Sequence, residues 1–175
     1  MMHGLNLGSG QRCFHSTPEI EWINVDVVSR PPNVPDVVCD VAKEKLPFDE
    51  NSIDYVVAWH LLEHFGCGEA DPIVKEAYRV LKPGGSFIAA VPDLGALARR
   101  WLAGELEDFL YTVNLYGAYQ GLESDRHRWG WSRVAFLHYI EKLAPWRSVA
   151  TRDNISLIGT DLMVDWWMAT VEAVK

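Results

Sequence analysis

The residues that could do chemistry begin with a glycine turn near the start of the chain. Leu5-Asn6-Leu7 is a short apolar run that leads into Gly8-Ser9-Gly10. Glycine allows the backbone a positive φ and, because it has no Cβ, lets a ligand approach closely. Asp26 ends a second apolar run, where a carboxylate can accept hydrogen bonds from the hydroxyls of a ribose. This spacing predicts a site for a nucleotide-type cofactor.

The glycine pattern does not complete a dinucleotide-binding fingerprint. That fingerprint has the form G-x-G-x-x-G, and the position three after Gly10 is Cys13. A dehydrogenase would also carry a separate substrate domain, for which 175 residues leave little room. The sequence therefore disfavours a nicotinamide cofactor.

Two histidines are candidates for a general base, because the pKa of imidazole lies near neutrality. His60 directly follows the apolar run 53–58, and His127 lies in a polar segment, where Asp125 could orient either histidine. Each has a plainer alternative, since His60 could simply line or cap a pocket and His127 could belong to a solvated charged loop. His64 and His138 fall among apolar neighbours on expected helices, where we expect structural roles.

The spacing of histidines and cysteines indicates no metal site. None of the six histidines forms an HExxH pattern, and Cys13, Cys39 and Cys67 form no CxxC pair. We therefore predict no metal ligands and no metal-dependent chemistry.

The elements that must position these residues follow an α/β pattern. Apolar runs over 5–7, 53–58 and 87–91 lack alternation, which is typical of parallel strands buried on both faces. Shorter strands are expected over 22–27 and 37–39. Since ligands of such sheets lie beyond the carboxyl ends of the strands, we expect one rim to carry Gly8, Asp26, Asp40 and His60.

Helical and closing elements complete the prediction. A helix is predicted from Asp71 as N-cap, with Pro72 at its first position, to the turn Pro83-Gly84-Gly85. Further helical patterns cover 106–113 and 132–143, and closing strands, the last one antiparallel, are expected around 156–158 and 166–174. The predicted fold is a three-layer, Rossmann-like, doubly wound and mostly parallel sheet. It forms a single domain over 1–175, with a helical insertion or cap over about 93–147.

These blocks, in this order, resemble the class I S-adenosylmethionine-dependent methyltransferases, in particular small type-11 members. Leu81-Lys82-Pro83-Gly84-Gly85 before a strand is the most specific block. The blocks that carry the resemblance are 5–10, 24–26, 39–41 followed by 46–48, 53–64 and 76–85. The chain departs from the family pattern at Asn6, where an acidic residue is usual, and at Arg12, where a third glycine is usual.

The resemblance implies S-adenosylmethionine as the cofactor and a small-molecule methyl acceptor, of which a sugar-like compound is one option. In-line transfer from the sulfonium requires mainly alignment and the exclusion of water, with His60 or His127 as a base when the acceptor is a hydroxyl. The alternative is a non-catalytic S-adenosylmethionine-binding sensor or assembly protein, since Asn6 weakens the charge pairing with the cofactor. The implied cofactor-binding residues are Asn6, Gly8, Ser9, Gly10, Asp26, Asp40, Val41 and His60.

Composition argues against other classes of partner. The formal charge of −8 and pI near 5.2 disfavour nucleic acid, whose phosphates are bound mainly by Lys and Arg. No apolar stretch approaches the roughly 18 residues of a membrane span, and three cysteines without a regular pairing suit a reducing compartment. We therefore expect a cytoplasmic protein. Its eight tryptophans make a homodimer an option.

Overall fold

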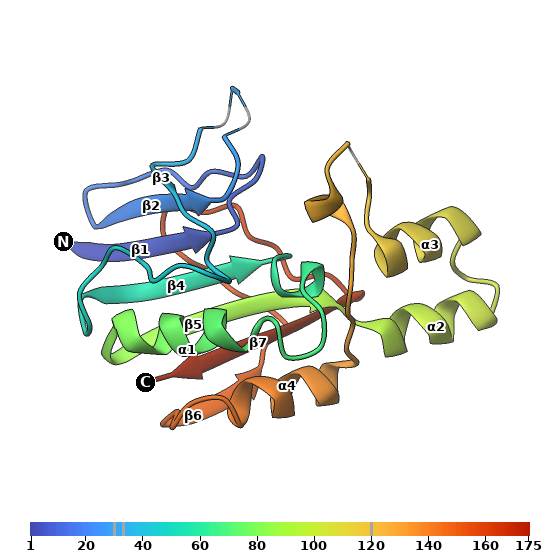
Figure 1. Ribbon diagram of the computed structural model, residues 1–175. Coiled ribbons are helices and arrows are strands. Elements are labelled where there is room, and N and C mark those ends of the chain that lie inside the picture. The colour runs from blue at the N-terminus through green and yellow to red at the C-terminus, as the bar shows by residue number, and fades with distance from the viewer. Residues whose placement is uncertain (30, 33, 120) are drawn as a thin grey trace.

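The computed structural model describes residues 1–29, 31–32, 34–119 and 121–175. Its centre is a seven-stranded sheet in the order β3-β2-β1-β4-β5-β7-β6 (Figure 1). The first five strands run parallel, and β7 runs antiparallel to both of its neighbours. This confirms the expected mostly parallel sheet with an antiparallel closing strand. The strands are β1 (Met2–Leu7), β2 (Ile20–Asp26), β3 (Val37–Val38), β4 (Ile53–Trp59), β5 (Leu81–Pro92), β6 (Ser148–Thr151) and β7 (Met168–Val174).

The helices fall into two groups. Helices α1 and α4 lie against one face of the sheet, whereas α2 and α3 project beyond the carboxyl ends of the parallel strands (Figure 1). Helix α1 packs because its apolar residues recur on one side, burying Ile73, Val74, Ala77 and Val80. The helical segments are η1 (Leu62–His64), α1 (Asp71–Val80), α2 (Leu94–Leu102), α3 (Asp108–Tyr116), η2 (Glu123–Asp125) and α4 (Arg133–Glu141).

The two faces of the sheet are covered differently. Phe87 and Ala89 of β5 belong to the core beneath α1 and α4, while Ile88 and Ala90 join a second core on the opposite face. That second core is closed by residues 152–167, which form no helix or strand and bury Leu162. The residues between β1 and β2 form no helix either. β1 and β2 are therefore joined by a loop and not by a crossover helix.

Three boundaries differ from the sequence prediction. The prediction of a strand at 156–158 was wrong, because that segment is coil. The edge strand is instead β6, which comes earlier in the chain and pairs with β7. The Pro83-Gly84-Gly85 turn does not end α1: the backbone becomes extended at Leu81, and the turn lies within β5. The N-cap of α1 is Ala70, because Asp71 lies inside the helix and its carboxylate accepts a hydrogen bond from the Tyr139 hydroxyl.

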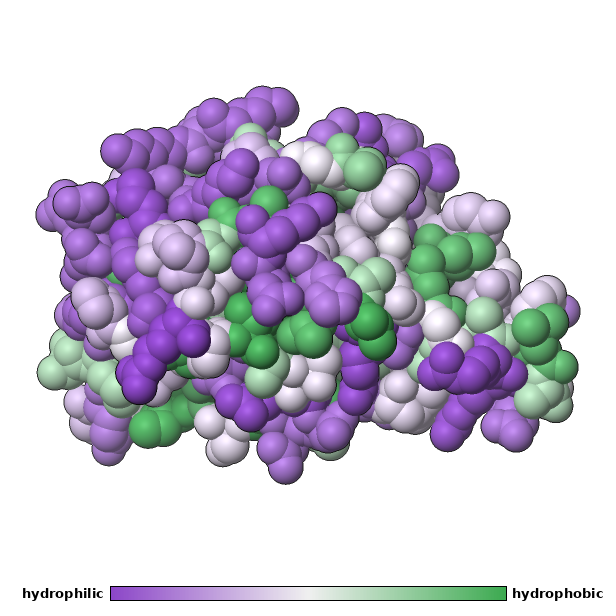
Figure 2. Space-filling model, turned by 90° about the horizontal axis from the view of Figure 1, so that it is seen from below, coloured by the Kyte–Doolittle hydropathy of each residue, from purple (hydrophilic) through white to green (hydrophobic). Residues whose placement is uncertain are grey.

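The segment between β5 and β6 places apolar side chains on the surface. Leu102 and Phe109 are 79% and 72% exposed, and no residue of α3 is buried. Figure 2 shows the molecule from the side of the β6 edge. In this view, hydrophobic side chains also lie on the surface at the end of the molecule that carries α2. Among the described residues, no helix is both long and apolar enough to cross a membrane.

Candidate functional site

A cavity of about 800 Å³ lies beyond the carboxyl ends of β1, β2 and β4. Its size falls within the range of roughly 300–1,000 Å³ that is usual for small-molecule sites. All four residues that were expected on one rim line this cavity, namely Gly8, Asp26, Asp40 and His60. The remaining lining residues are Gly10, Val27, Cys39, Val41, Leu61, His64, Phe65, Glu123, Ser124, Asp125, Arg126 and Arg128.

The turn after β1 presents bare backbone to this cavity. Gly8 and Gly10 have φ values of +66° and +51°, in the left-handed region that favours glycine. A Cβ on Gly8 would lie 2.5 Å from Cδ1 of Leu61, so a side chain does not fit there. A Cβ on Gly10 would meet only the carbonyl oxygen of Gly8, at 3.9 Å. The backbone at Gly10 is therefore open to a ligand.

Asp26 holds this turn with its carboxylate. Its Oδ2 accepts the N–H of Gly10 at 2.8 Å, and its Oδ1 accepts the N–H of Val28 at 2.9 Å. A carboxylate has about four acceptor positions, so each oxygen keeps a lone pair for a further donor. Because Asp26 is partly exposed and lines the cavity, those lone pairs can bind ligand hydroxyls.

Asp40 and Val41 form the next part of the wall. Asp40 Oδ2 accepts a hydrogen bond from Nζ of Lys43 at 2.8 Å, and Oδ1 accepts the N–H of Ala42 at 3.2 Å. The Lys43 ammonium, followed by smaller effects, holds the pKa of Asp40 below its ordinary value. Asp40 is thus an anion at neutral pH. Val41 is buried and adds an apolar surface beside it.

Asn6 and Ser9 do not line the cavity. Both are 3% exposed, and the Asn6 amide donates to the carbonyl of Arg12 at 2.8 Å and to Oδ1 of Asn24 at 3.0 Å. The same Oδ1 accepts the N–H of Phe14. Asn6 therefore supports the loop after the glycine turn from beneath. The hydroxyl of Ser9 has no hydrogen-bond partner among the described residues.

His60 occupies an unusual backbone position at the end of β4. Its φ is +56°, which is uncommon for a residue with a side chain and often marks a functional position. Its ring stacks on Trp167 with centroids 5.2 Å apart, and its Nδ1 lies 3.0 Å from Oε1 of Glu63. Since a carboxylate oxygen accepts, Nδ1 carries the proton, and Nε2 of the neutral ring is free to take one.

Glu63 is the buried centre of the histidine-rich wall. Its side chain is 1% exposed, and burial alone would raise its pKa, but the hydrogen bond from His60 and the nearby histidines His64 and His127 hold that pKa below its ordinary value. Oε1 is taken by His60, whereas Oε2 has no partner among the described residues. Glu63 is therefore a buried carboxylate with one free oxygen.

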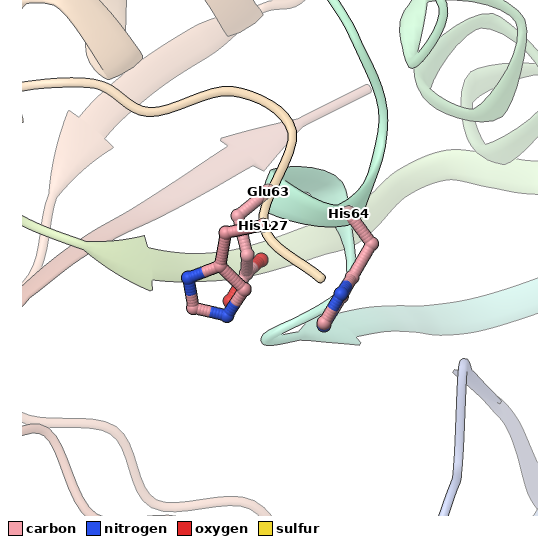
Figure 3. A group of neighbouring side chains, drawn as sticks. All are labelled: Glu63, His64 and His127. Carbon is pink, nitrogen blue, oxygen red and sulfur yellow. The ribbon is translucent and has the colours of Figure 1, made fainter. Parts of the chain in front are cut away.

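His64 and His127 meet beside this carboxylate. Figure 3 shows Glu63 and His64 on η1 and His127 on the segment that passes it. The two imidazoles make an edge-to-face contact with centroids 5.0 Å apart. Burial lowers the pKa of His127 below 6.5, so its ring is neutral at neutral pH. His127 does not line the cavity, whereas His64 does.

The predicted insertion supplies the far wall of the cavity. Residues 123–126 and Arg128 line it, and the segment is fixed because the N–H groups of Arg128 and Trp129 both donate to the carbonyl oxygen of Glu63, at 2.8 and 3.2 Å. Arg128 also forms an ion pair with Glu69 at 2.9 Å. Sequence reasoning did not find Glu63 or His64 as site residues, because their partner His127 lies far along the chain.

Comparison with known proteins shows what this chain is similar to. Residues 16–89 match the family model described as a methyltransferase domain. The chain is 27% identical over 150 residues, 79% of its length, to the biotin biosynthesis bifunctional protein BioHC of Cellvibrio japonicus. It is 33% identical over 86 residues, 49% of its length, to the mitochondrial 2-methoxy-6-polyprenyl-1,4-benzoquinol methylase of Dictyostelium discoideum. It spans 29% and 20% of the lengths of these two relatives.

The fold agrees with this match. A SAM-dependent methyltransferase from Archaeoglobus fulgidus superposes with a TM-score of 0.62 at 13% identity, covering 99% of this chain and 86% of that one. Residues 16–89 are therefore similar to a methyltransferase domain, and the chain has the fold of the solved SAM-dependent methyltransferases from Archaeoglobus fulgidus and Thermotoga maritima.

Proposed function

We propose that the protein transfers the methyl group of S-adenosylmethionine to a small-molecule acceptor held beneath the insertion. The observation that carries this proposal is the cavity in which Asp26, Asp40 and the open backbone at Gly10 share one wall. A wall of this kind offers carboxylate acceptors for hydroxyl donors and bare backbone for a close approach. These are the groups that an adenosine with an amino-acid tail requires.

Different residues of this wall would bind different parts of the cofactor. The free lone pairs of Asp26 would accept the hydroxyls of the ribose, and Asp40 with Val41 would hold the adenine. The backbone at Gly10 would hold the amino-acid tail. When bound, the cofactor supplies a methyl group on a positively charged sulfur. Asn6 and Ser9 contribute through the shape of the turn, because neither side chain reaches the cavity.

His60 is the base that the geometry favours for a hydroxyl acceptor. Glu63 fixes its ring through Nδ1, which directs the basic Nε2 away from that carboxylate. His60 would take the proton of the acceptor hydroxyl on Nε2, and S-adenosylmethionine would supply the methyl group and leave as S-adenosylhomocysteine. The polar wall from Glu123 to Arg128 suits a sugar-like acceptor with several hydroxyls.

One observation favours a second candidate, a protein that binds the cofactor without using it. Asn6 stands where the related sequences usually carry an acid, and its amide is used to hold the loop at Arg12 and Asn24. A site without that acid lacks one charge partner for the ammonium group of the cofactor. Such a protein would be a sensor or an assembly partner.

One experiment separates the two functions. Binding of S-adenosylhomocysteine is measured by calorimetry, and transfer is measured with labelled methyl groups and a panel of sugars and other hydroxyl-bearing metabolites. We expect transfer to at least one compound, and we expect His60→Gln to lower its turnover about 100-fold or more. The exposed His138→Gln is the matched control. Binding without transfer to any compound supports the sensor, and absence of binding overturns both functions.

A further inference from the structure

We propose that Glu63, His64 and His127 bind a divalent transition-metal ion at the wall of the cavity. One ligand atom from each of the three residues lies within 4.8 Å of the other two. Metal–nitrogen and metal–oxygen bonds of about 2.0–2.2 Å place the ligand atoms of a tetrahedral site roughly 3.3–3.6 Å apart. Side-chain rotations that bring the ligand atoms closer together would therefore close the site around an ion, and Figure 3 shows the three side chains gathered at one place.

The hydrogen bonds of the two histidines leave the correct nitrogen free. Nδ1 of His64 lies 3.2 Å from the carbonyl oxygen of Arg126, and Nδ1 of His127 lies 2.9 Å from that of Asn114. Because a carbonyl oxygen only accepts, both Nδ1 atoms carry a proton and each neutral ring has its lone pair on Nε2. Metal-binding histidines are usually oriented in this way, by a carbonyl or carboxylate behind the ring.

The free carboxylate oxygen of Glu63 is the second, independent observation. Its side chain is 1% exposed, and Oε2 has no hydrogen-bond partner among the residues that the structure describes. Buried polar atoms without a partner are rare and call for an explanation such as an ion. One carboxylate oxygen of Glu63 lies within 4.8 Å of a ring nitrogen of His64 and of a ring nitrogen of His127. An ion there would complete the bonding of all three groups.

The donor set indicates which ion the site would take. Two imidazole nitrogens and one carboxylate oxygen are the ligands of open zinc sites and of non-haem ferrous sites, and they are unlike the all-oxygen shells of magnesium and calcium. Such sites keep a coordination position for water or substrate. His64 lines the cavity, so the ion would lie at its edge. If the proposed transfer reaction is correct, the ion would polarise the acceptor hydroxyl beside His60.

The test measures metal binding in the absence of cofactor. Protein stripped with a chelator is titrated with Zn²⁺ by calorimetry and with Co²⁺ by visible absorption, which reports the coordination geometry. We expect one ion per chain. We also expect a loss of affinity of tenfold or more in His64→Asn, His127→Asn and Glu63→Gln. His138→Asn should bind the ion as tightly as the wild type, because His138 lies outside the cluster. It is a matched control, since His138 pairs with Glu141 three residues later, just as His60 pairs with Glu63.

Thermal unfolding of each stripped variant shows whether it folds. If Glu63→Gln does not fold, His64→Asn still decides the test, because His64 is partly exposed and can be replaced without disturbing the buried core. The inference is overturned if the stripped wild type binds no stoichiometric ion, if the folded His64 and His127 variants keep full affinity, or if His138→Asn loses as much. A separate titration of stripped protein with S-adenosylhomocysteine tests the proposed function. Metal binding without cofactor binding would remove that function and leave the metal site.

Discussion

Replacing Asp26 with asparagine tests the proposed ribose contact. The Asp26→Asn side chain would keep one acceptor oxygen and turn the other into an NH₂ group, which would face the N–H of either Gly10 or Val28. Hydrogen bonds to a charged group contribute about 1.5–3 kcal/mol each. Losing the carboxylate toward the ribose therefore weakens binding of S-adenosylhomocysteine by about 10- to 150-fold, since 1.4 kcal/mol corresponds to about a factor of ten.

The assay is calorimetry with Asp54→Asn as the matched control. Asp54 also accepts two hydrogen bonds, from the N–H of His3 at 2.8 Å and from Nζ of Lys82 at 2.7 Å. It lies near the start of β4, at the opposite end of the parallel strands from the cavity, so its loss destabilises the fold without touching the ligand. Unchanged affinity in Asp26→Asn, or an equal loss in both variants, would refute the reasoning.

Three further changes act on stability and are measured by urea unfolding. Gly10→Ala places a side chain at a φ of +51° and should cost about 1–2 kcal/mol; no loss would contradict the conformation of the turn. Phe136→Ala, at a fully buried position in α4, should cost about 3–5 kcal/mol. Burial raises the pKa of Glu76, but the Arg79 guanidinium outweighs it and holds that pKa below 4.5. Because the folded value is lowered, Glu76 stabilises the fold above pH 4.5. Glu76→Gln should therefore cost about 1.5–3 kcal/mol near neutrality and less as the pH falls through the folded value, while the exposed Glu44→Gln should cost little at any pH.

The parallel sheet could be predicted because its signals are local. The apolar runs that become β1, β4 and β5 are short, continuous and lack alternation, which suits only strands covered on both faces. The edge of the sheet could not be located in the same way. The edge strand β6, with the sequence Ser-Val-Ala-Thr, has one neighbour and no buried residue, so its sequence carries little pattern. The apolar residues around 156–158 instead cover the second core as coil.

The wall that carries Asp26 and Asp40 and the opposite wall, at Glu63 and His127, also differed in how far the sequence could predict them. Asp26 and Asp40 follow successive strands, and the carboxyl ends of parallel strands meet at one edge, so position in the chain nearly determines position in space. Asn6 showed the limit of this rule, because at the end of β1 it points to the loop that holds Phe14 and not to the cavity. The approach of His127 to Glu63 depends on how a helical insertion docks, which no spacing in the sequence encodes.

Glu63 is the residue through which these two walls are joined. Its backbone carbonyl fixes the insertion by accepting the N–H groups of Arg128 and Trp129, and its side chain orients His60. Burial of a carboxylate costs several kcal/mol unless partners compensate it, and only one of its oxygens has such a partner among the described residues. A buried carboxylate with one unpartnered oxygen beside two imidazoles is a poor arrangement for stability alone. It is a good arrangement for binding a cation. The chemistry of the acceptor would therefore depend more on the wall at Glu63, His64 and His127 than on the wall at Asp26 and Asp40.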